Sequence, residues 1–242
     1  MATAAGVLQP SASAKNEKHH RIKAVAIDAF VIFDPRGLTK QAEESFPGRG
    51  TEFTNLWRTT QFQYTWLRTI GGRYKDFGQV IQDALEYTAT TMQLELTQAQ
   101  RQDFLNMYRT LPLWPDVSET LEEIRSRGIR LAFLSNFSAA MLDSNLASAK
   151  LKGYFEPHLT TDLVKAFKPS PLAYGMGPNG FGLERDEIAF AAFGGWDAVG
   201  AKWFGYPTVW VNRTKVNLER LDAQPDAIVT NLKGVLDFVN AS

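Results

Sequence analysis

Four polar features of the sequence fall at or just beyond short apolar runs, and their side chains could do chemistry together. Asp28 lies inside the run "AIDAFVIF" (26–33), and Asp197 follows the run "EIAFAAF". Ser135–Asn136 ends another run, and Lys168 stands in "FKPSP". An unpaired buried carboxylate costs several kcal/mol, so Asp28 needs a countercharge, a path to solvent or a chemical role. Structural explanations also exist, with the two aspartates as caps and the lysine on the surface.

The elements that position these residues alternate between strand-like and helix-like patterns. A helix is predicted over residues 117–127, where apolar positions share one face and Gly128 follows. Buried runs typical of strands occur at residues 22–30, 129–136, 187–195 and 207–212. This alternation predicts an α/β fold with a doubly wound parallel sheet, in which ligands bind at the carboxyl ends of the strands. All four polar features would then meet at one rim of the sheet.

Residues 39–112 interrupt the alternation with helical patterns alone. Three amphipathic segments follow one another without a strand between them, at residues 51–70, 76–94 and 97–110. We therefore expect a helical insertion at 39–112 and a core formed by residues 21–38 and 113–242. Residues 1–20 are rich in Ala, Ser and Lys without sustained periodicity, and we expect a disordered tail there.

Composition narrows the possible chemistry. The 242 residues carry 26 basic and 26 acidic side chains without a long basic run, so neither nucleic acid nor an anionic membrane is an expected partner. No apolar stretch approaches the roughly 20 residues of a membrane-spanning helix. The absence of cysteine removes thiolate nucleophiles, and only three histidines occur, which disfavours a Ser-His-Asp triad or a multi-histidine metal site. A hydrolase would therefore depend on carboxylates and lysine.

Taken together, these positions resemble the haloacid dehalogenase (HAD) superfamily, and within it the type II L-2-haloacid dehalogenases. The resemblance spans roughly residues 22–240. Its motifs are "LWRTTQFQYTWLRTIGGRYKDF", "LSN", "KPSPLAY" and "WDAVGAKWFGYPTVWVNR", of which the first and last contain strings specific to this branch. The resemblance implies a Rossmann-like core with an inserted helical cap domain, no metal or other cofactor, and a homodimer. We expect a cytoplasmic location, or a periplasmic one if the tail is the remnant of a processed leader.

By this resemblance Asp28 is the nucleophile. It would displace halide from a short 2-haloacid with inversion and form an ester, which water then opens at the aspartyl carbonyl. Lys168 would keep Asp28 ionised and help to hold the substrate carboxylate, because a nearby cation favours the charged form of a carboxyl group. Ser135 would hydrogen bond to the substrate carboxylate or to Asp28. Arg58 would lie over the leaving halide, and Asn136 would share that site.

Further matches complete the implied site. Asp197 would orient Lys168 or activate the hydrolytic water, and Tyr174 matches a tyrosine of the family. Apolar side chains would exclude water around the substrate, and core packing is the alternative explanation for them. These residues are Phe62, Phe77 and Trp196, and Phe30 of the nucleophile loop is also expected to contact the substrate.

Two loops depart from the pattern of the family. The nucleophile loop, commonly D-x-Y-G-T-L, has Phe30, Val31 and Ile32 in place of tyrosine, glycine and a threonine that normally bonds the nucleophile. The loop S-S-N-A-W-D has Ala192 and Gly194 in place of a serine and an asparagine associated with the hydrolytic water. A lost hydrogen bond to a charged group is worth roughly 1.5 to 3 kcal/mol, so the rate and substrate range are expected to differ.

Two other functions are compatible with the same fold. A phosphatase of the superfamily needs a second aspartate two residues after the nucleophile and a further acid near the last motif, where this chain has Phe30 and Phe193. A non-catalytic binding protein would explain the lost hydroxyl and amide groups. We favour an active dehalogenase, because four ionisable groups in one dehydrated site are costly unless they work. These groups are Asp28, Arg58, Lys168 and Asp197.

Overall fold

A parallel sheet forms the core of the computed structural model, which describes residues 21–242. Within those residues its order is β3-β2-β1-β4-β5-β6, and every ladder is parallel. The strands are β1 (Ala24–Ile27), β2 (Arg130–Ser135), β3 (Leu159–Thr160), β4 (Ile188–Ala192), β5 (Thr208–Val211) and β6 (Ala227–Val229). This order confirms the predicted doubly wound fold, and it places the switch point, where such sheets bind ligands, between β1 and β4. The predicted tail at 1–20 lies outside the described residues.

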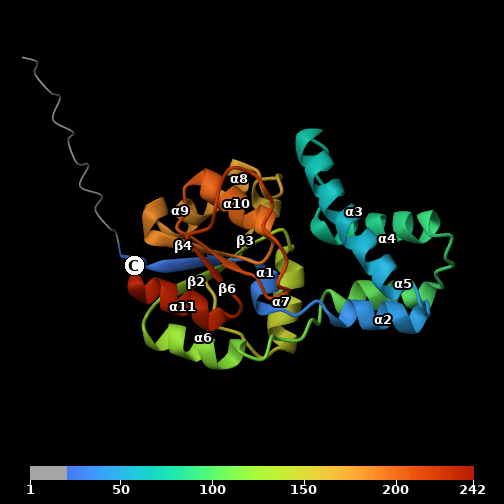
Figure 1. Cartoon of the computed structure of the whole chain (residues 1–242), viewed down its shortest axis with the longest axis horizontal. Coiled ribbons are helices and arrows are strands. Elements are labelled where there is room, and N and C mark those ends of the chain that lie inside the picture. The colour runs from blue at the N-terminus through green and yellow to red at the C-terminus, as the bar shows by residue number, and fades with distance from the viewer. Residues whose placement is uncertain (1–20) are drawn as a thin grey trace, which may run out of the picture.

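Helices cover both faces of the sheet, which explains why its strands read as continuous apolar runs. Val25 and Ile27 of β1 pack into one core cluster, whereas Ala24 and Ala26 pack into the other. Figure 1 shows α6 (Val117–Ser126) and α11 (Leu232–Ala241) on one face. The opposite face carries α8 (Pro171–Tyr174), α9 (Met176–Phe181) and α10 (Gly195–Phe204). The helix predicted at 117–127 is therefore confirmed as α6.

The sequence pattern predicted that the apolar run around Asp28 forms a single strand, and this prediction was wrong. Strand β1 ends at Ile27, and Ala29–Ile32 form a single helical turn, α1. Asp28 has extended backbone angles, and its carboxylate accepts a hydrogen bond from the Phe30 N–H at 2.9 Å, which caps this turn. Val31 and Ile32 are fully buried, and periodicity alone does not separate a buried strand from a buried helical turn.

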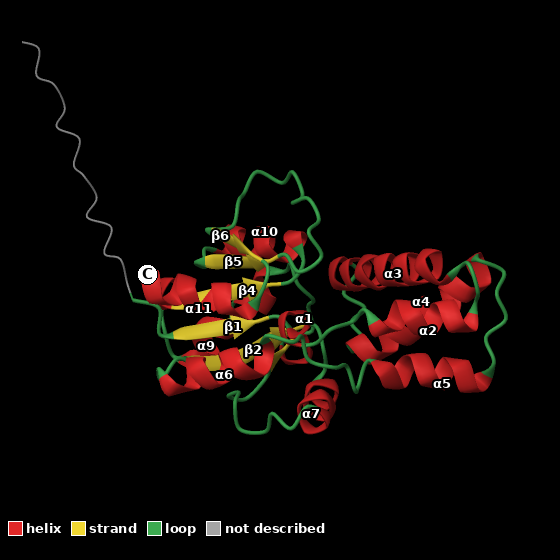
Figure 2. Cartoon of the chain, turned by 60° about the horizontal axis from the view of Figure 1, so that its bottom comes forward, coloured by secondary structure: helices red, strands yellow, loops and turns green. Residues whose placement is uncertain are grey.

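Four helices, rather than the predicted three, lie between α1 and α6. They are α2 (Gly37–Ser45), α3 (Gly50–Ile70), α4 (Phe77–Thr91) and α5 (Gln98–Met107), and Figure 2 shows them beside the sheet. The pattern missed α2 because this short, polar helix buries only Leu38 and Ala42. No helix within residues 21–242 is long and apolar enough to cross a membrane.

The two connections of this helical insertion (α2–α5) lie side by side, and Asn145 of α7 (Ala139–Ser148) holds the second of them. The Asp34 N–H donates to the Pro112 carbonyl oxygen at 2.8 Å. Asn145 is fully buried, and its Oδ1 accepts from the Leu111 N–H at 2.8 Å while its Nδ2 donates to the Tyr108 carbonyl oxygen at 2.8 Å. One side chain thus satisfies two backbone groups at the junction.

Replacing this amide should destabilise the protein. In Asn145→Ala the Leu111 N–H and the Tyr108 carbonyl lose their partner, and each unpaired buried group costs about 1–3 kcal/mol. Urea denaturation should show a lower free energy of unfolding. Ser144→Ala, on the exposed side of the same helix, serves as the control and should lose far less. Equal losses in the two variants would contradict the role given to Asn145.

Candidate active site

Asp28 lies at the carboxyl end of β1, at the switch point of the sheet. Its side chain is 12% exposed, so water reaches it only from one side. Oδ1 accepts from the Phe30 N–H at 2.9 Å, and Oδ2 accepts from Lys168 Nζ at 2.7 Å. The carboxylate is therefore held in a fixed orientation, with donors on both oxygens.

Lys168 joins Asp28 to Asp197, which confirms that these distant segments meet at one rim. Its Nζ donates to Asp28 Oδ2 at 2.7 Å and to Asp197 Oδ2 at 2.6 Å, and its side chain is 1% exposed. The backbone N–H of Lys168 donates to Asn136 Oδ1 at 3.1 Å, which aligns the segment before α8. Burial by itself lowers the pKa of Lys168, but the attraction of the two carboxylates outweighs burial and raises it. The bridging group is therefore a cation.

Asp197 lies in the first turn of α10, where the helix dipole favours an anion. Burial raises the pKa of Asp197 to about 6, the charge of Lys168 opposes this shift, and the charge of Asp28 adds to it. Tyr174 Oη donates to Asp197 Oδ1 at 2.8 Å. Burial, and then the charge of Asp197, raise the pKa of Tyr174 well above its ordinary value, so the phenol stays protonated and acts as the donor.

Tyr174 and Lys168 lie behind Asp197 and Asp28 rather than in the cavity. Tyr174 is fully buried, and neither side chain is among those that line the cavity. The family resemblance also assigns Tyr174 to the substrate-binding residues, and in the structure its phenol faces Asp197. A Cβ atom at Gly200 would come within 2.5 Å of Tyr174 Oη, so the glycine of "WDAVGAK" lets α10 approach this tyrosine.

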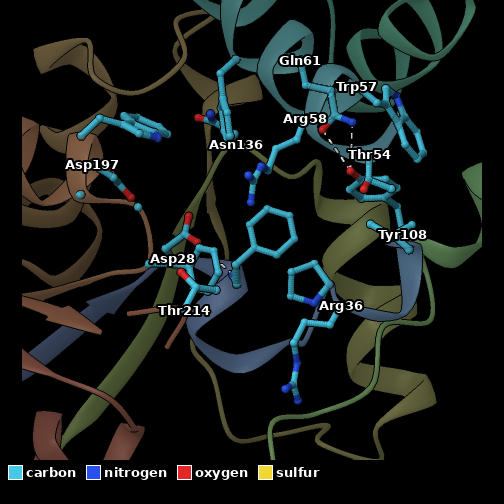
Figure 3. Close-up of a pocket in the computed structure, with 18 of the residues that line it drawn as sticks. Asp28, Arg36, Thr54, Trp57, Arg58, Gln61, Tyr108, Asn136, Asp197 and Thr214 are labelled. Carbon is cyan, nitrogen blue, oxygen red and sulfur yellow. Dashed lines mark hydrogen bonds between the residues drawn. The ribbon is translucent and has the colours of Figure 1, made fainter. Parts of the chain in front are cut away.

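A cavity of about 350 Å³ separates the sheet rim from α3 of the insertion. Figure 3 shows Asp28, Asn136 and Asp197 on the core side and Arg58, Gln61 and Trp57 on the insertion side. Most of the predicted site residues line this cavity. They are Asp28, Phe30, Arg58, Phe62, Phe77, Ser135, Asn136, Trp196 and Asp197.

Arg58 extends from α3 into this cavity (Figure 3). Its guanidinium donates to Asn55 Oδ1 at 3.3 Å, and it forms no ion pair with any residue of the described chain. On the core side, Ser135 Oγ accepts from the Phe137 N–H at 3.1 Å, and Asn136 Oδ1 is already bonded to Lys168. The hydroxyl of Ser135 and the Nδ2 of Asn136 are thus left as donors beside the cavity.

Aromatic side chains form much of the wall. Phe30 packs edge to face on Phe137 (ring centroids 5.2 Å apart), and Phe77 stacks on the same ring at 5.6 Å. Trp196 of α10 packs on Phe62 of α3 at 5.2 Å, so one aromatic contact joins core and insertion. These rings give much of the cavity an apolar wall, beside which charges interact more strongly than they do in bulk water.

The loops that depart from the family pattern are filled by apolar groups. Val31, Ile32 and Ala192 are fully buried in the core clusters. A Cβ atom at Gly194 would lie 2.9 Å from Trp196 Nε1, so the indole covers the space into which a larger side chain would project. Glycine at position 194 therefore lets the Trp196 indole pack closely against the backbone, in addition to lacking the amide side chain of the family's asparagine.

Gln61 and Tyr108 form a polar pair in the cavity that the motifs did not predict. Gln61 Nε2 donates to Tyr108 Oη at 3.0 Å, and both side chains are buried. Burial raises the pKa of Tyr108, so its phenol stays protonated. The sequence did carry a signal for this pair. Gln61 lies four residues after Trp57, so a polar residue falls on the buried face of an amphipathic helix. Among residues 21–242, no group of three or more His, Cys, Asp or Glu side chains could hold a metal ion.

Removing the phenol behind Asp197 should change the titration of that carboxyl group. The Tyr174 hydrogen bond stabilises ionised Asp197 and lowers its pKa, so Tyr174→Phe should move that pKa upward from about 6. The pH dependence of the Asp197 carboxyl ¹³C signal measures the shift. Tyr206→Phe is the matched control, because Tyr206 Oη donates to the Tyr174 carbonyl oxygen. A downward shift in Tyr174→Phe, or equal shifts in both, would contradict this assignment.

Several known proteins are similar to this chain over most of its length. A family model described as haloacid dehalogenase-like hydrolase matches residues 19–205. The (S)-2-haloacid dehalogenase of Pseudomonas sp. (strain YL) is 37% identical over 218 residues, which cover 90% of this chain and 94% of that protein. Haloacetate dehalogenase H-2 of Moraxella sp. (strain B) is 33% identical, covering 90% and 98%. The structure of the Xanthobacter autotrophicus L-2-haloacid dehalogenase with chloropropionic acid covalently bound has a TM-score of 0.82 and 30% identity, covering 90% and 98%.

Proposed function

Because the chain belongs to the HAD superfamily, and within it to the L-2-haloacid dehalogenase group, we propose that it removes halide from short 2-haloacids through an ester on Asp28. The single observation that carries this proposal is the Asp28–Lys168–Asp197 bridge at the floor of a cavity that Arg58 enters from the other side. The relative that carries covalently bound chloropropionic acid supports an ester step here.

In the first step the Asp28 carboxylate attacks the carbon that bears the halogen. A C–O bond forms as the carbon–halogen bond breaks, and halide leaves with the bonding electron pair. Lys168 Nζ and the Phe30 N–H hold the attacking carboxylate in place. Arg58, which has no ion-pair partner in the described chain, and Asn136 Nδ2 stabilise the negative charge on the departing halide.

In the second step water attacks the aspartyl carbonyl carbon. When the tetrahedral intermediate collapses, the leaving alkoxide takes up the proton held by Asp197 and departs as a 2-hydroxyacid. The Asp28 carboxyl group then loses its remaining proton to solvent and is again a carboxylate. Ionised Asp197 accepts the proton of the attacking water, and with its pKa of about 6 it is ionised at neutral pH. The Asp28 oxygen that remains the carbonyl oxygen of the ester becomes the oxyanion, and one donor already contacts it, Lys168 Nζ at Oδ2 or the Phe30 N–H at Oδ1. Ala192 and Gly194 supply no side-chain hydrogen bond to the water, so Asp197 carries more of its orientation.

The substrate carboxylate fits the polar edge of the cavity, and its alkyl group fits the aromatic wall. Ser135 Oγ lines the cavity at the end of β2 and can donate to the carboxylate. Phe30, Phe62, Phe77 and Trp196 exclude water around the reacting carbon.

We further propose a homodimer and a cytoplasmic location. The exposed apolar side chains of the insertion, Leu67, Ile70 and Tyr87, support the dimer.

Removing the nucleophile should abolish turnover. Asp28→Asn should release no halide above background from 2-chloropropionate, chloroacetate or fluoroacetate, because the amide is not a competent nucleophile. Halide release by ion chromatography, with mass spectrometry of the Asp28 peptide for a trapped ester, measures this. Asp226→Asn is the control and should keep turnover within a few-fold, since Asp226 pairs with Lys202 and neither residue lines the cavity. If the unaltered protein released no halide, a non-catalytic role would be favoured instead.

Removing the cation above the halide should slow the first step. Arg58→Ala should lower the rate of halide release by about 100-fold, the loss typical of one removed charge-stabilising donor. Single-turnover halide release measures this step. Arg68→Ala on the same helix is the control, because Arg68 pairs with Asp83 and does not line the cavity. Normal release in Arg58→Ala would exclude this residue from the mechanism.

A further inference from the structure

The one-turn helix α1, which carries Asp28 at its start, is held from outside at its other end. A single turn leaves its last carbonyl groups without intrahelical partners. The Phe30 carbonyl oxygen accepts from Trp114 Nε1 at 2.9 Å, and the Ile32 carbonyl oxygen accepts from the Trp114 N–H at 3.2 Å. Between them, the Val31 carbonyl oxygen accepts from Arg213 Nη2 at 2.8 Å and Nε at 3.1 Å. External donors therefore fix the position of this turn.

Arg213 is itself held rigidly. It follows β5, and its side chain is 3% exposed. Its Nη1 and Nη2 donate to the two carboxylate oxygens of Asp116 at 2.7 and 3.1 Å, and its guanidinium lies 4.8 Å from the centroid of the Trp114 ring. Asp116 also accepts from the Leu232 N–H at the start of α11, at 2.7 Å. The guanidinium is thus anchored directly to the segment that precedes α6, and through Asp116 to the start of α11.

We infer that Arg213 is a positioning residue for the nucleophile. It does not line the cavity, so it acts on Asp28 only through the backbone of α1. The Asp28 carboxylate at one end of the turn meets Lys168 at 2.7 Å, and a shift or tilt of the turn would misalign that contact. The residue four positions after Asp28 is Ile32, which has no hydroxyl to bond the nucleophile. The orientation of Asp28 therefore depends on Lys168, on the Phe30 N–H and on the backbone clamp.

This inference rests on the proposed function for its kinetic test, in which Arg213→Lys keeps the charge but loses the forked contact. We expect kcat for halide release from 2-chloropropionate to fall about 10- to 100-fold, because small misplacements of reacting groups have effects of this size. KM should change less than about three-fold, since the cavity wall is untouched. An unchanged kcat would overturn the inference.

Arg130→Lys is the matched control. Arg130 also forms a forked pair with a carboxylate, to Glu156 at 2.6 and 2.9 Å, and donates to the Phe181 carbonyl oxygen at 2.8 Å. It stands at the start of β2, at the end of the strand opposite to the site. If both variants lost the same activity per folded molecule, Arg213 would have only a structural role, and the inference would fail.

A second readout does not need turnover. The ¹³C chemical shift of the Asp28 carboxyl group should change in Arg213→Lys and should be unchanged in Arg130→Lys. If the unaltered protein released no halide, the proposed function would fail, and this signal would still decide the positioning role. Should Arg213→Lys not fold, Asp116→Asn weakens the same clamp from its far side. An unmoved Asp28 signal in the folded variant would overturn the inference.

Discussion

A single ammonium group, Lys168 Nζ, holds two carboxylates together at the rim of the sheet. Removing one partner from a buried ion pair typically costs about 3–5 kcal/mol, because the remaining charge is left uncompensated. Here the loss of Lys168 would leave Asp28 and Asp197 facing each other in a nearly dry site. The surrounding structure follows from this constraint, with the Tyr174 phenol and the first turn of α10 both supporting Asp197. These supports keep two anions close together, as the proposed two-step reaction requires.

The core and the insertion divide the chemistry between them. The core supplies a floor with two carboxylates and one cation, whereas the insertion supplies a second cation, Arg58, and part of the aromatic wall. A 2-haloacid carries a carboxylate and releases a halide, so it needs positive charge away from the nucleophile. The contact between Trp196 and Phe62 closes one side of the cavity across this division. The paired charges of the core and the guanidinium of Arg58 thus face the cavity from opposite sides.

The apolar replacements around Asp28 change how the nucleophile is held. Polar side chains are absent at Val31, Ile32, Ala192 and Gly194, and packing fills their places. The orientation of the carboxylate then depends on backbone and long-range contacts, with Arg213 and Trp114 holding α1 from one side and Lys168 from the other. Such a site gains rigidity from its core and lacks hydrogen-bonding side chains where the proposed reaction places the attacking water.

Local sequence determined the fold class and the principal polar residues of the site. Strand and helix periods differ, and parallel strands bring their carboxyl ends to one rim, so the sequence alone was enough to place Asp28, Ser135–Asn136 and Asp197 together. Only the tertiary structure decided where β1 ends, because a buried turn and a buried strand are equally apolar. It also placed Tyr174 behind Asp197 and Arg213 behind α1. Those roles depend on contacts between residues far apart in the chain, such as Arg213 and Val31, and periodicity carries no information about them.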